Sequence, residues 1–302
     1  MHNYYVSQSK TTDPGKFAYL FDELPDEVER ISEIVSNLIF HYFGDKHVYG
    51  WEIPAERICE IDSRDVSTML STLLKRDNCP LIEARVPETR VVGCCRDFAT
   101  FFVSIMRHKG IPARTRYGFA TYFEDGFYVD HVVAEIWNGE RWQIIDPELN
   151  ETRIHSFKIT GLDPMDLREG EFLNSAEAWL LARQNQVDAD RFCVTASEKN
   201  PATRGLNYIA SHIVQDVAAL NRVDSLCWDW WGFDMFDPAT SSFGPPTPEQ
   251  YAQLDEAAEV ILSNDLERIQ KLYMQQPFTP KRVWSWSPAL ADNQKPVELS
   301  LI

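Results

Sequence analysis

The spacing of apolar residues in the first third of the chain predicts three helices. From 22 to 43, and again from 65 to 75, apolar side chains recur every three or four positions, which is the period of one helix face. A third helix is predicted from Cys94 or Cys95 to Gly110, because glycine commonly ends a helix and Pro112 forbids its continuation. The apolar positions are Ile31, Ile34, Val35, Leu38, Ile39 and Tyr42, then Val66, Met69, Leu70, Leu73 and Leu74, then Phe98, Phe101, Phe102, Ile105 and Met106.

After Arg114 the pattern changes to strands rich in aromatic and β-branched residues, at 115–123, 131–137 and 141–146. Asn138-Gly139 between the last two is a strong hairpin signal. A two-residue turn there sets Trp137 opposite Glu140, and the same register then sets His131 opposite Asp146. Opposed residues have Cβ atoms about 5 Å apart, so the pattern predicts a histidine–aspartate pair.

Helical spacing returns in the second half of the chain, and 241–249 is predicted to be a surface loop. Helices at both ends and strands between them indicate an α+β fold. The later helices are expected at 174–184, 205–221, 248–262 and 265–275.

Composition narrows the classes of partner. The 302 residues carry a formal charge of −17, which disfavours nucleic acid and anionic membrane surfaces as partners. The start of the chain does not resemble a secretion signal, and no apolar run approaches the roughly 20 residues of a membrane span. Six cysteines in a chain of this length are too sparse for a disulfide scaffold. We therefore expect free thiols and a cytoplasmic location.

Two cysteines at the start of the third helix point to nucleophilic chemistry. A thiolate at a helix N-terminus is favoured by the helix dipole and by nearby backbone N–H groups. Together with a histidine held by an aspartate, such a thiolate forms the nucleophile, base and orienting carboxylate of cysteine acyl transfer. The pattern therefore indicates an enzyme.

Four segments, in this order, resemble the transglutaminase-like superfamily of papain-type cysteine enzymes. The resemblance implies a papain-like core, in which the helix bearing cysteine packs on an antiparallel sheet, with further helices at both ends. It also implies Cys95 as nucleophile, His131 as base and Asp146 as orienting carboxylate. The segments are "GCCRDFA", "GIPAR", "DHVVAEIW" and "RWQIIDP".

The flanking segments "GFATYFEDGFYVDH" and "WDWWG" are similar to a little-characterised bacterial group of transglutaminase-like proteins. We therefore expect one unit over 1–302, with a helical part at 1–90, the catalytic motifs at 91–150 and a mainly helical part at 151–302. The chain lacks an acidic run that would match the calcium sites of the large animal transglutaminases. The resemblance thus implies a calcium-independent protein without a cofactor, and weakens the case for protein cross-linking.

Other interpretations of the two cysteines remain open. Cys95 could be an inert buried thiol, and Cys94 could be the nucleophile in its place. A vicinal disulfide between them would be strained. A zinc site made of Cys94, Cys95 and His131 fits poorly, because structural zinc sites usually space their cysteines two to four residues apart. We expect no metal.

Three further residues are candidates for substrate or oxyanion contacts. Trp51 could supply a donor to the oxyanion hole, and Trp228 or Asp229 could line a substrate cleft. The segment 227–237 could equally be an aromatic plug in the core. We expect a small-molecule or peptide amide or thioester as substrate, and a hydrolase (amidase or peptidase) ahead of an amide-forming acyltransferase or a non-catalytic binding module. The sequence does not indicate an oligomeric state.

Overall fold

The chain divides into two compact units. Unit 1 comprises Met1–Thr115 and Val132–Arg168, and unit 2 comprises Arg116–His131 and Glu169–Ile302. That the whole chain forms one transglutaminase-like unit stays a prediction. The computed structural model describes residues 2–197, 200–233, 236–237, 242–243, 246–290 and 296–299.

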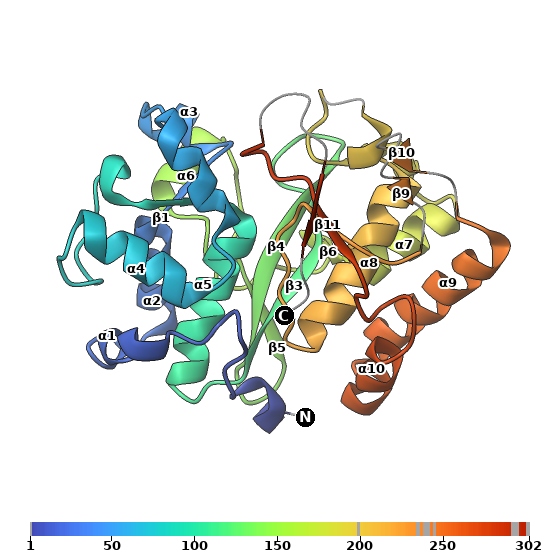
Figure 1. Cartoon of the computed structure of the whole chain (residues 1–302), viewed down its shortest axis with the longest axis horizontal. Helices are drawn as coiled ribbons and strands as arrows, with labels where there is room; N and C mark the ends of the chain where they lie inside the picture. The colour runs from blue at the N-terminus through green and yellow to red at the C-terminus, as the bar shows by residue number, and fades with distance from the viewer. Residues whose placement is uncertain are drawn as a thin grey trace. The chain divides into compact units, whose positions relative to one another are not determined.

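A five-stranded sheet contains segments of both units, because the division falls within two of its strands. Its order is β5-β4-β3-β6 (Figure 1). The strand β7 also pairs with β4. The β4–β5 and β3–β6 pairs are antiparallel, whereas β4–β7 is parallel. This largely antiparallel sheet among many helices confirms the α+β class. The strands are β3 (Ala113–Ala120), β4 (Tyr128–Trp137), β5 (Trp142–Ile145), β6 (Phe172–Asn174) and β7 (Phe192–Cys193).

Unit 1 is built around α5, the helix that begins with the second cysteine. All of α5 except its last residue is buried, and it contacts the helices α2 and α4 and the strands β1 and β2. The predicted helices at 65–75 and 94–110 are confirmed as α4 and α5. The elements are α1 (Tyr19–Asp22), α2 (Val28–Leu38), α3 (Asp45–Tyr49), α4 (Val66–Arg76), α5 (Cys95–His108), α6 (Glu151–Ser156), β1 (Ile39–His41) and β2 (Val91–Gly93).

The first predicted helix is shorter than its apolar spacing suggested. The helix α2 ends at Leu38, and Ile39 already has the extended angles φ −118° and ψ 141°. Ile39–His41 instead forms β1, which pairs in parallel with β2. The prediction that Ile39 and Tyr42 continue the helix is therefore wrong, because pairing with a distant segment takes precedence over local periodicity.

The hairpin register also differs from the prediction. Trp137 pairs with Trp142 rather than with Glu140, so four residues, not two, connect β4 and β5. The side chain of Asn138 causes this, because its Oδ1 accepts hydrogen bonds from the N–H groups of Glu140 and Arg141, both at 3.0 Å.

The register shift changes the partner of Asp146. Ala134 pairs with Ile145, and one further step of the ladder would place Val133, not His131, opposite Asp146. The shift is by two residues, so the alternation of strand faces is unchanged.

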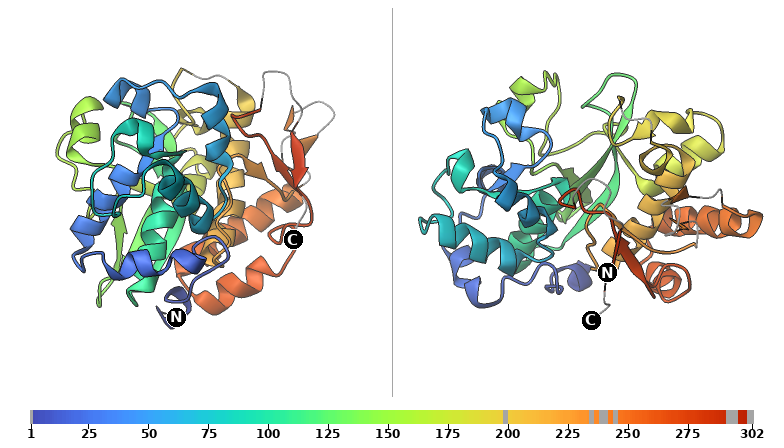
Figure 2. Two further views of the ribbon diagram at one scale, coloured as in Figure 1. Left: turned by 60° about the vertical axis from the view of Figure 1, so that its left-hand side comes forward. Right: turned by 45° about the horizontal axis from the view of Figure 1, so that its top comes forward.

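Unit 2 contains the remaining helices (Figure 2). They pack around a second apolar core. Its helices α7, α8, α9 and α10 confirm the four helices predicted in the second half. The predicted loop 241–249 lies partly outside the described residues, and its end forms the start of α9. The elements are α7 (Ser175–Arg183), α8 (Leu206–Leu220), α9 (Pro248–Ser263), α10 (Leu266–Tyr273), β8 (Asp229–Trp230), β9 (Phe236–Asp237), β10 (Ser242–Phe243), β11 (Val283–Ser285) and β12 (Val297–Leu299).

Short 3-10 helices connect many of these elements. They are η1 (His2–Tyr5), η2 (Gly15–Phe17), η3 (Ala55–Asp62), η4 (Pro87–Thr89), η5 (Ala189–Arg191) and η6 (Pro201–Thr203). Within the part of the chain that the structure describes, none of the helices combines the length and the apolar character that crossing a lipid bilayer requires.

Candidate active site

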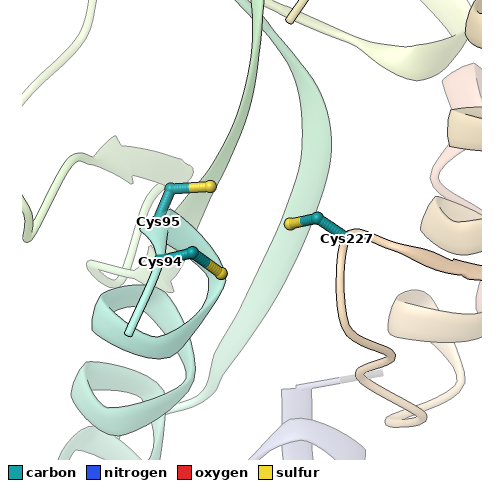
Figure 3. Close-up of side chains that lie close together, drawn as sticks. All are labelled: Cys94, Cys95 and Cys227. Carbon is teal, nitrogen blue, oxygen red and sulfur yellow. The ribbon is translucent and has the colours of Figure 1, made fainter. Parts of the chain in front are cut away.

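The two cysteines lie where β2 passes directly into α5 (Figure 3). Cys94 is the N-cap residue, with the extended angles φ −130° and ψ −178°, and Cys95 is the first helical residue. Their sulfur atoms lie within 4.8 Å of one another, and the two cysteines do not form a vicinal disulfide. Figure 3 also labels Cys227, which belongs to unit 2.

The position of Cys95 suits a reactive thiolate. The first N–H groups of a helix have no intrahelical partner, and the positive end of the dipole stabilises a negative charge there. Cys95 retains 7% of its exposure, whereas Cys94 retains 2%. The two thiols alone do not make the four-ligand set of a structural zinc site.

Arg96 and Asp97 fix the first turn of α5. Asp97 is 1% exposed, and its Oδ2 accepts a hydrogen bond of 2.8 Å from the N–H of Cys94. Its Oδ1 accepts from the guanidinium of Arg96 at 3.0 Å. Arg96 in turn donates to the backbone carbonyl of Arg64 at 2.8 Å, which ties the turn to the segment before α4.

Asp146 lies directly after β5 in unit 1 and is fully buried. Its backbone N–H donates to the carbonyl of Pro164 at 2.8 Å, and its Oδ1 accepts from the N–H of Glu148 at 3.0 Å. These bonds hold both the main chain and the carboxylate of Asp146 in one orientation.

His131 lies in β4 and is 3% exposed. It is the last residue of the first segment of unit 2, so the division places Cys95 and Asp146 in one unit and His131 at the edge of the other. The rings of Phe123 and Tyr122 meet its imidazole edge to face, with centroids 5.1 Å and 6.2 Å away. Two aromatic rings therefore restrict the orientation of the imidazole.

Trp51 follows α3 in unit 1 and is partly buried. Its ring meets Phe40 edge to face at 4.8 Å, and the guanidinium of Arg57 lies 4.8 Å from its centroid. Phe40 pairs with Val92 of β2, the strand that leads into the cysteines. Trp51 is thus connected to that strand through Phe40. Its role as an oxyanion donor stays a prediction.

Trp228 and Asp229 are buried in unit 2. The carboxylate of Asp229 accepts a hydrogen bond from the N–H of Leu226 at 3.1 Å, and its carbonyl accepts from Gln215 at 3.1 Å. The carbonyl of Trp228 accepts from Trp286 at 2.9 Å. These bonds give both residues a structural role, and a substrate contact stays a prediction. Asp234 and Met235 of the aromatic segment 227–237 lie outside the described residues.

Residues 80–147 match the transglutaminase-like superfamily. The chain contains a transglutaminase-like domain. The matched segment holds β2, α5, β3, β4 and β5, and therefore every residue of the candidate Cys–His–Asp set. The match supports cysteine-based catalysis in general.

No curated protein matches the sequence. Among solved structures, a candidate cysteine protease from Cytophaga hutchinsonii aligns with 16% identity and a TM-score of 0.33. The alignment covers 56% of this chain and 44% of that one, so the chain spans less than half of that protein's length.

The sequence interpretation missed the aromatic residues beside the histidine. Tyr122 and Phe123 were expected to end a strand, whereas β3 ends at Ala120 and both rings contact His131. Aromatic residues are common in strands, so their type alone does not distinguish a core position from a contact with a functional residue. Their place in "GFATYFEDGFYVDH", shortly before the histidine, was the available signal.

Proposed function

We propose that the chain is a cysteine hydrolase that cleaves an amide or thioester through an acyl-enzyme on Cys95. The observation that supports it most is the place of Cys95. It is the first residue of a buried helix of 14 residues, inside the segment that matches the transglutaminase-like superfamily. Among the six cysteines, only Cys94 shares that environment.

In the proposed mechanism the Cys95 thiolate attacks the carbonyl carbon of the substrate. A carbon–sulfur bond forms, and the developing oxyanion is stabilised by backbone N–H groups at the start of α5. His131 gives a proton to the leaving amine or thiol as the carbonyl bond to that group breaks. Asp146, fixed by its bond from Glu148, orients the imidazole.

The second half of the reaction needs another nucleophile. His131 would take a proton from water, whose oxygen attacks the acyl carbon and releases the acid and the Cys95 thiolate. An amine at the same step would make an amide bond and an acyltransferase, which is the second candidate. We favour hydrolysis because water is always available. Peptides and small molecules with an amide or thioester are both proposed substrates.

Alkylation tests the nucleophile without a known substrate. Iodoacetamide at neutral pH should modify Cys95 faster than Cys59, which is exposed and lies in a 3-10 helix. The variant His131→Ala should slow the modification of Cys95, while Phe127→Ala, in the loop before β4, should leave it unchanged. Equal rates at Cys95 and Cys59 would overturn the proposal and favour a binding module.

Trapping identifies the chemistry. Mass spectrometry of the protein after incubation with cell extract should find an acyl adduct on Cys95, and Cys95→Ala should abolish it. An adduct that water removes supports the hydrolase. An adduct that only an added amine removes supports the acyltransferase, and an adduct on Cys94 alone would overturn the assignment of the nucleophile.

A further inference from the structure

The adjacent thiols raise a problem of selectivity. Cys94 and Cys95 both lie at the positive end of α5, so the dipole favours ionisation of either one. Reaction at one defined sulfur therefore needs a feature that treats the two thiols differently.

Asp97 is placed to provide that difference. Residues three apart at the start of a helix are neighbours on its surface, whereas residues two apart are not. Asp97 is three residues from Cys94 and two from Cys95. Its carboxylate accordingly accepts a hydrogen bond from the N–H of Cys94 at 2.8 Å, and the backbone N–H of Asp97 in turn points to the Cys94 side chain.

Gly93 makes this close approach possible. A Cβ atom built at residue 93 would lie 2.7 Å from Oδ2 of Asp97 and 3.1 Å from Ile39 of β1. Any side chain at residue 93 would therefore push the carboxylate away. Gly93 is therefore needed to leave room for the Asp97 carboxylate. Its φ lies outside the left-handed region, so backbone conformation is not the reason for a glycine there.

We propose that Asp97 selects between the two thiols, because its carboxylate holds Cys94 as a neutral thiol and leaves Cys95 to ionise. The inference rests on the proposed role of Cys95 as nucleophile. Asp97 is here a positioning residue that acts on the neighbouring sulfur and does not touch the substrate.

The electrostatics of the first turn agree with this role. Burial raises the pKa of the Asp97 carboxyl well above its usual range, and the charge of the Cys94 side chain raises it further, while Arg96 acts against both. Coupling between two groups is reciprocal, so an ionised Asp97 disfavours a thiolate at Cys94. The hydrogen bonds of Asp97 favour its charged form, because Oδ1 accepts from the guanidinium of Arg96 and Oδ2 accepts from the N–H of Cys94.

The carboxylate of Glu60, which lies beside β2, is paired with arginine side chains. Glu60 of η3 accepts a hydrogen bond from the N–H of Val92 at 3.0 Å and is paired with Arg57 and Arg76. The uncharged Gly93 of β2 lies next to the Asp97 side chain, and Ile39 of β1 lies next to the same glycine.

A thiolate titration tests the inference without a requirement for reagent access. The ultraviolet thiolate absorbance of Cys95→Ala minus that of Cys94→Ala/Cys95→Ala reports Cys94 alone. Adding Asp97→Asn to both proteins should lower the apparent pKa of Cys94 by about one unit, which gives about tenfold more thiolate below that pKa. Asp65→Asn, which changes the N-cap of α4, should not shift it. An unchanged Cys94 titration in a folded Asp97→Asn protein would overturn the inference.

A second comparison keeps the test decisive if Asp97→Asn does not fold. With Asp97 intact, Cys94 in the Cys95→Ala protein should titrate at least about one unit above Cys95 in the Cys94→Ala protein. Equal or reversed values would overturn the inference. The proposed function is tested separately, because it fails if Cys95→Ala keeps its acyl adduct and turnover, whatever the Cys94 titration shows.

Discussion

The guanidinium of Arg153 and the carboxylate of Asp45 form an ion pair from which solvent is fully excluded. Nε of Arg153 lies 2.8 Å from Oδ1 of Asp45, and both side chains are 0% exposed. The same guanidinium donates to the carbonyls of Ser36 and Ile39 and lies 4.9 Å from the ring of Phe98 on α5. One cation therefore joins α3, α6 and β1 to the helix that carries the cysteines.

Removal of one member of this pair should destabilise the protein strongly. Asp45→Ala leaves a buried guanidinium without its counter-ion, and we expect the free energy of unfolding to fall by about 3–5 kcal/mol. Urea unfolding followed by circular dichroism measures it. Replacement of both partners, in Asp45→Ala/Arg153→Met, should recover part of the loss. The exposed pair of Arg30 and Glu33 is the control, and Arg30→Ala should cost less than about 1 kcal/mol. Similar losses for Asp45→Ala and Arg30→Ala would contradict this prediction.

Gly118 should be required because a larger side chain would clash with the neighbouring strand, and not because of its backbone conformation. A Cβ atom at this position in β3 would lie 2.1 Å from the carbonyl oxygen of Leu173 in β6. Gly118→Ala must open the β3–β6 ladder, so we expect a loss of about 1–3 kcal/mol and faster amide exchange in both strands. Gly50, with φ +70° and no atom near its missing Cβ, is the matched control. Gly50→Ala should cost about 1 kcal/mol from backbone strain without a change of exchange in β3. Protection of β6 that survives in Gly118→Ala would refute the steric argument.

His212 should make the protein sensitive to acid. Burial lowers its pKa from the usual 6.5, against the opposing charges of Asp130 and Asp216. The unfolded chain therefore binds a proton that the folded chain does not, so stability is lost as the pH falls from about 6.5 towards the folded pKa.

The loss at His212 is measured by chemical unfolding at several pH values. The slope due to this residue should be at most about 1.4 kcal/mol per pH unit, and His212→Gln should remove it. The exposed His155 is the control, because His155→Gln should keep the full slope. Identical pH dependence in His212→Gln and in the unaltered protein would rule out this assignment.

Phe123 should hold the imidazole of His131 for catalysis. Loss of its edge-to-face contact in Phe123→Leu removes an interaction worth about 0.5–1.5 kcal/mol, so we expect up to about a tenfold fall in turnover. Phe127→Leu alters the same loop but faces Arg204 at 5.6 Å, and it should keep normal turnover. A loss in both variants would indicate damage to the loop rather than to the contact with His131.

The elements that the sequence predicted correctly are those whose signal is local. Helices such as α4 and α5 repeat their apolar residues over three turns or more, and Asp65 and Gly110 mark their ends. The strands β1 and β2 have only three residues each, and they pair Ile39 with Val91, which is far away in the sequence. A pairing at that distance has no local signature, so helical periodicity was extended past Leu38.

The candidate site shows the same limit. Cys95 was predicted to be the nucleophile from the start of its helix and from the segment "GCCRDFA", and this role also stays a prediction. The hairpin register was wrong by two residues because one side chain, Asn138, closes a longer loop than Asn-Gly usually does. The roles of His131 and Asp146 stay predictions, since they depend on distances between separate segments.

The two compact units alternate along the chain, which passes from one unit to the other after residues 115, 131 and 168. The first of these boundaries falls inside β3 and the second inside β4. A protease cut or a shortened gene cannot release either unit whole. A fragment that stops at 168 would retain the strand ends of unit 2 without β6 and β7, which pair with them. The transglutaminase-like segment therefore cannot be excised and expressed alone as a folded domain. Only an uninterrupted chain supplies the partners of both ends of β3 and β4.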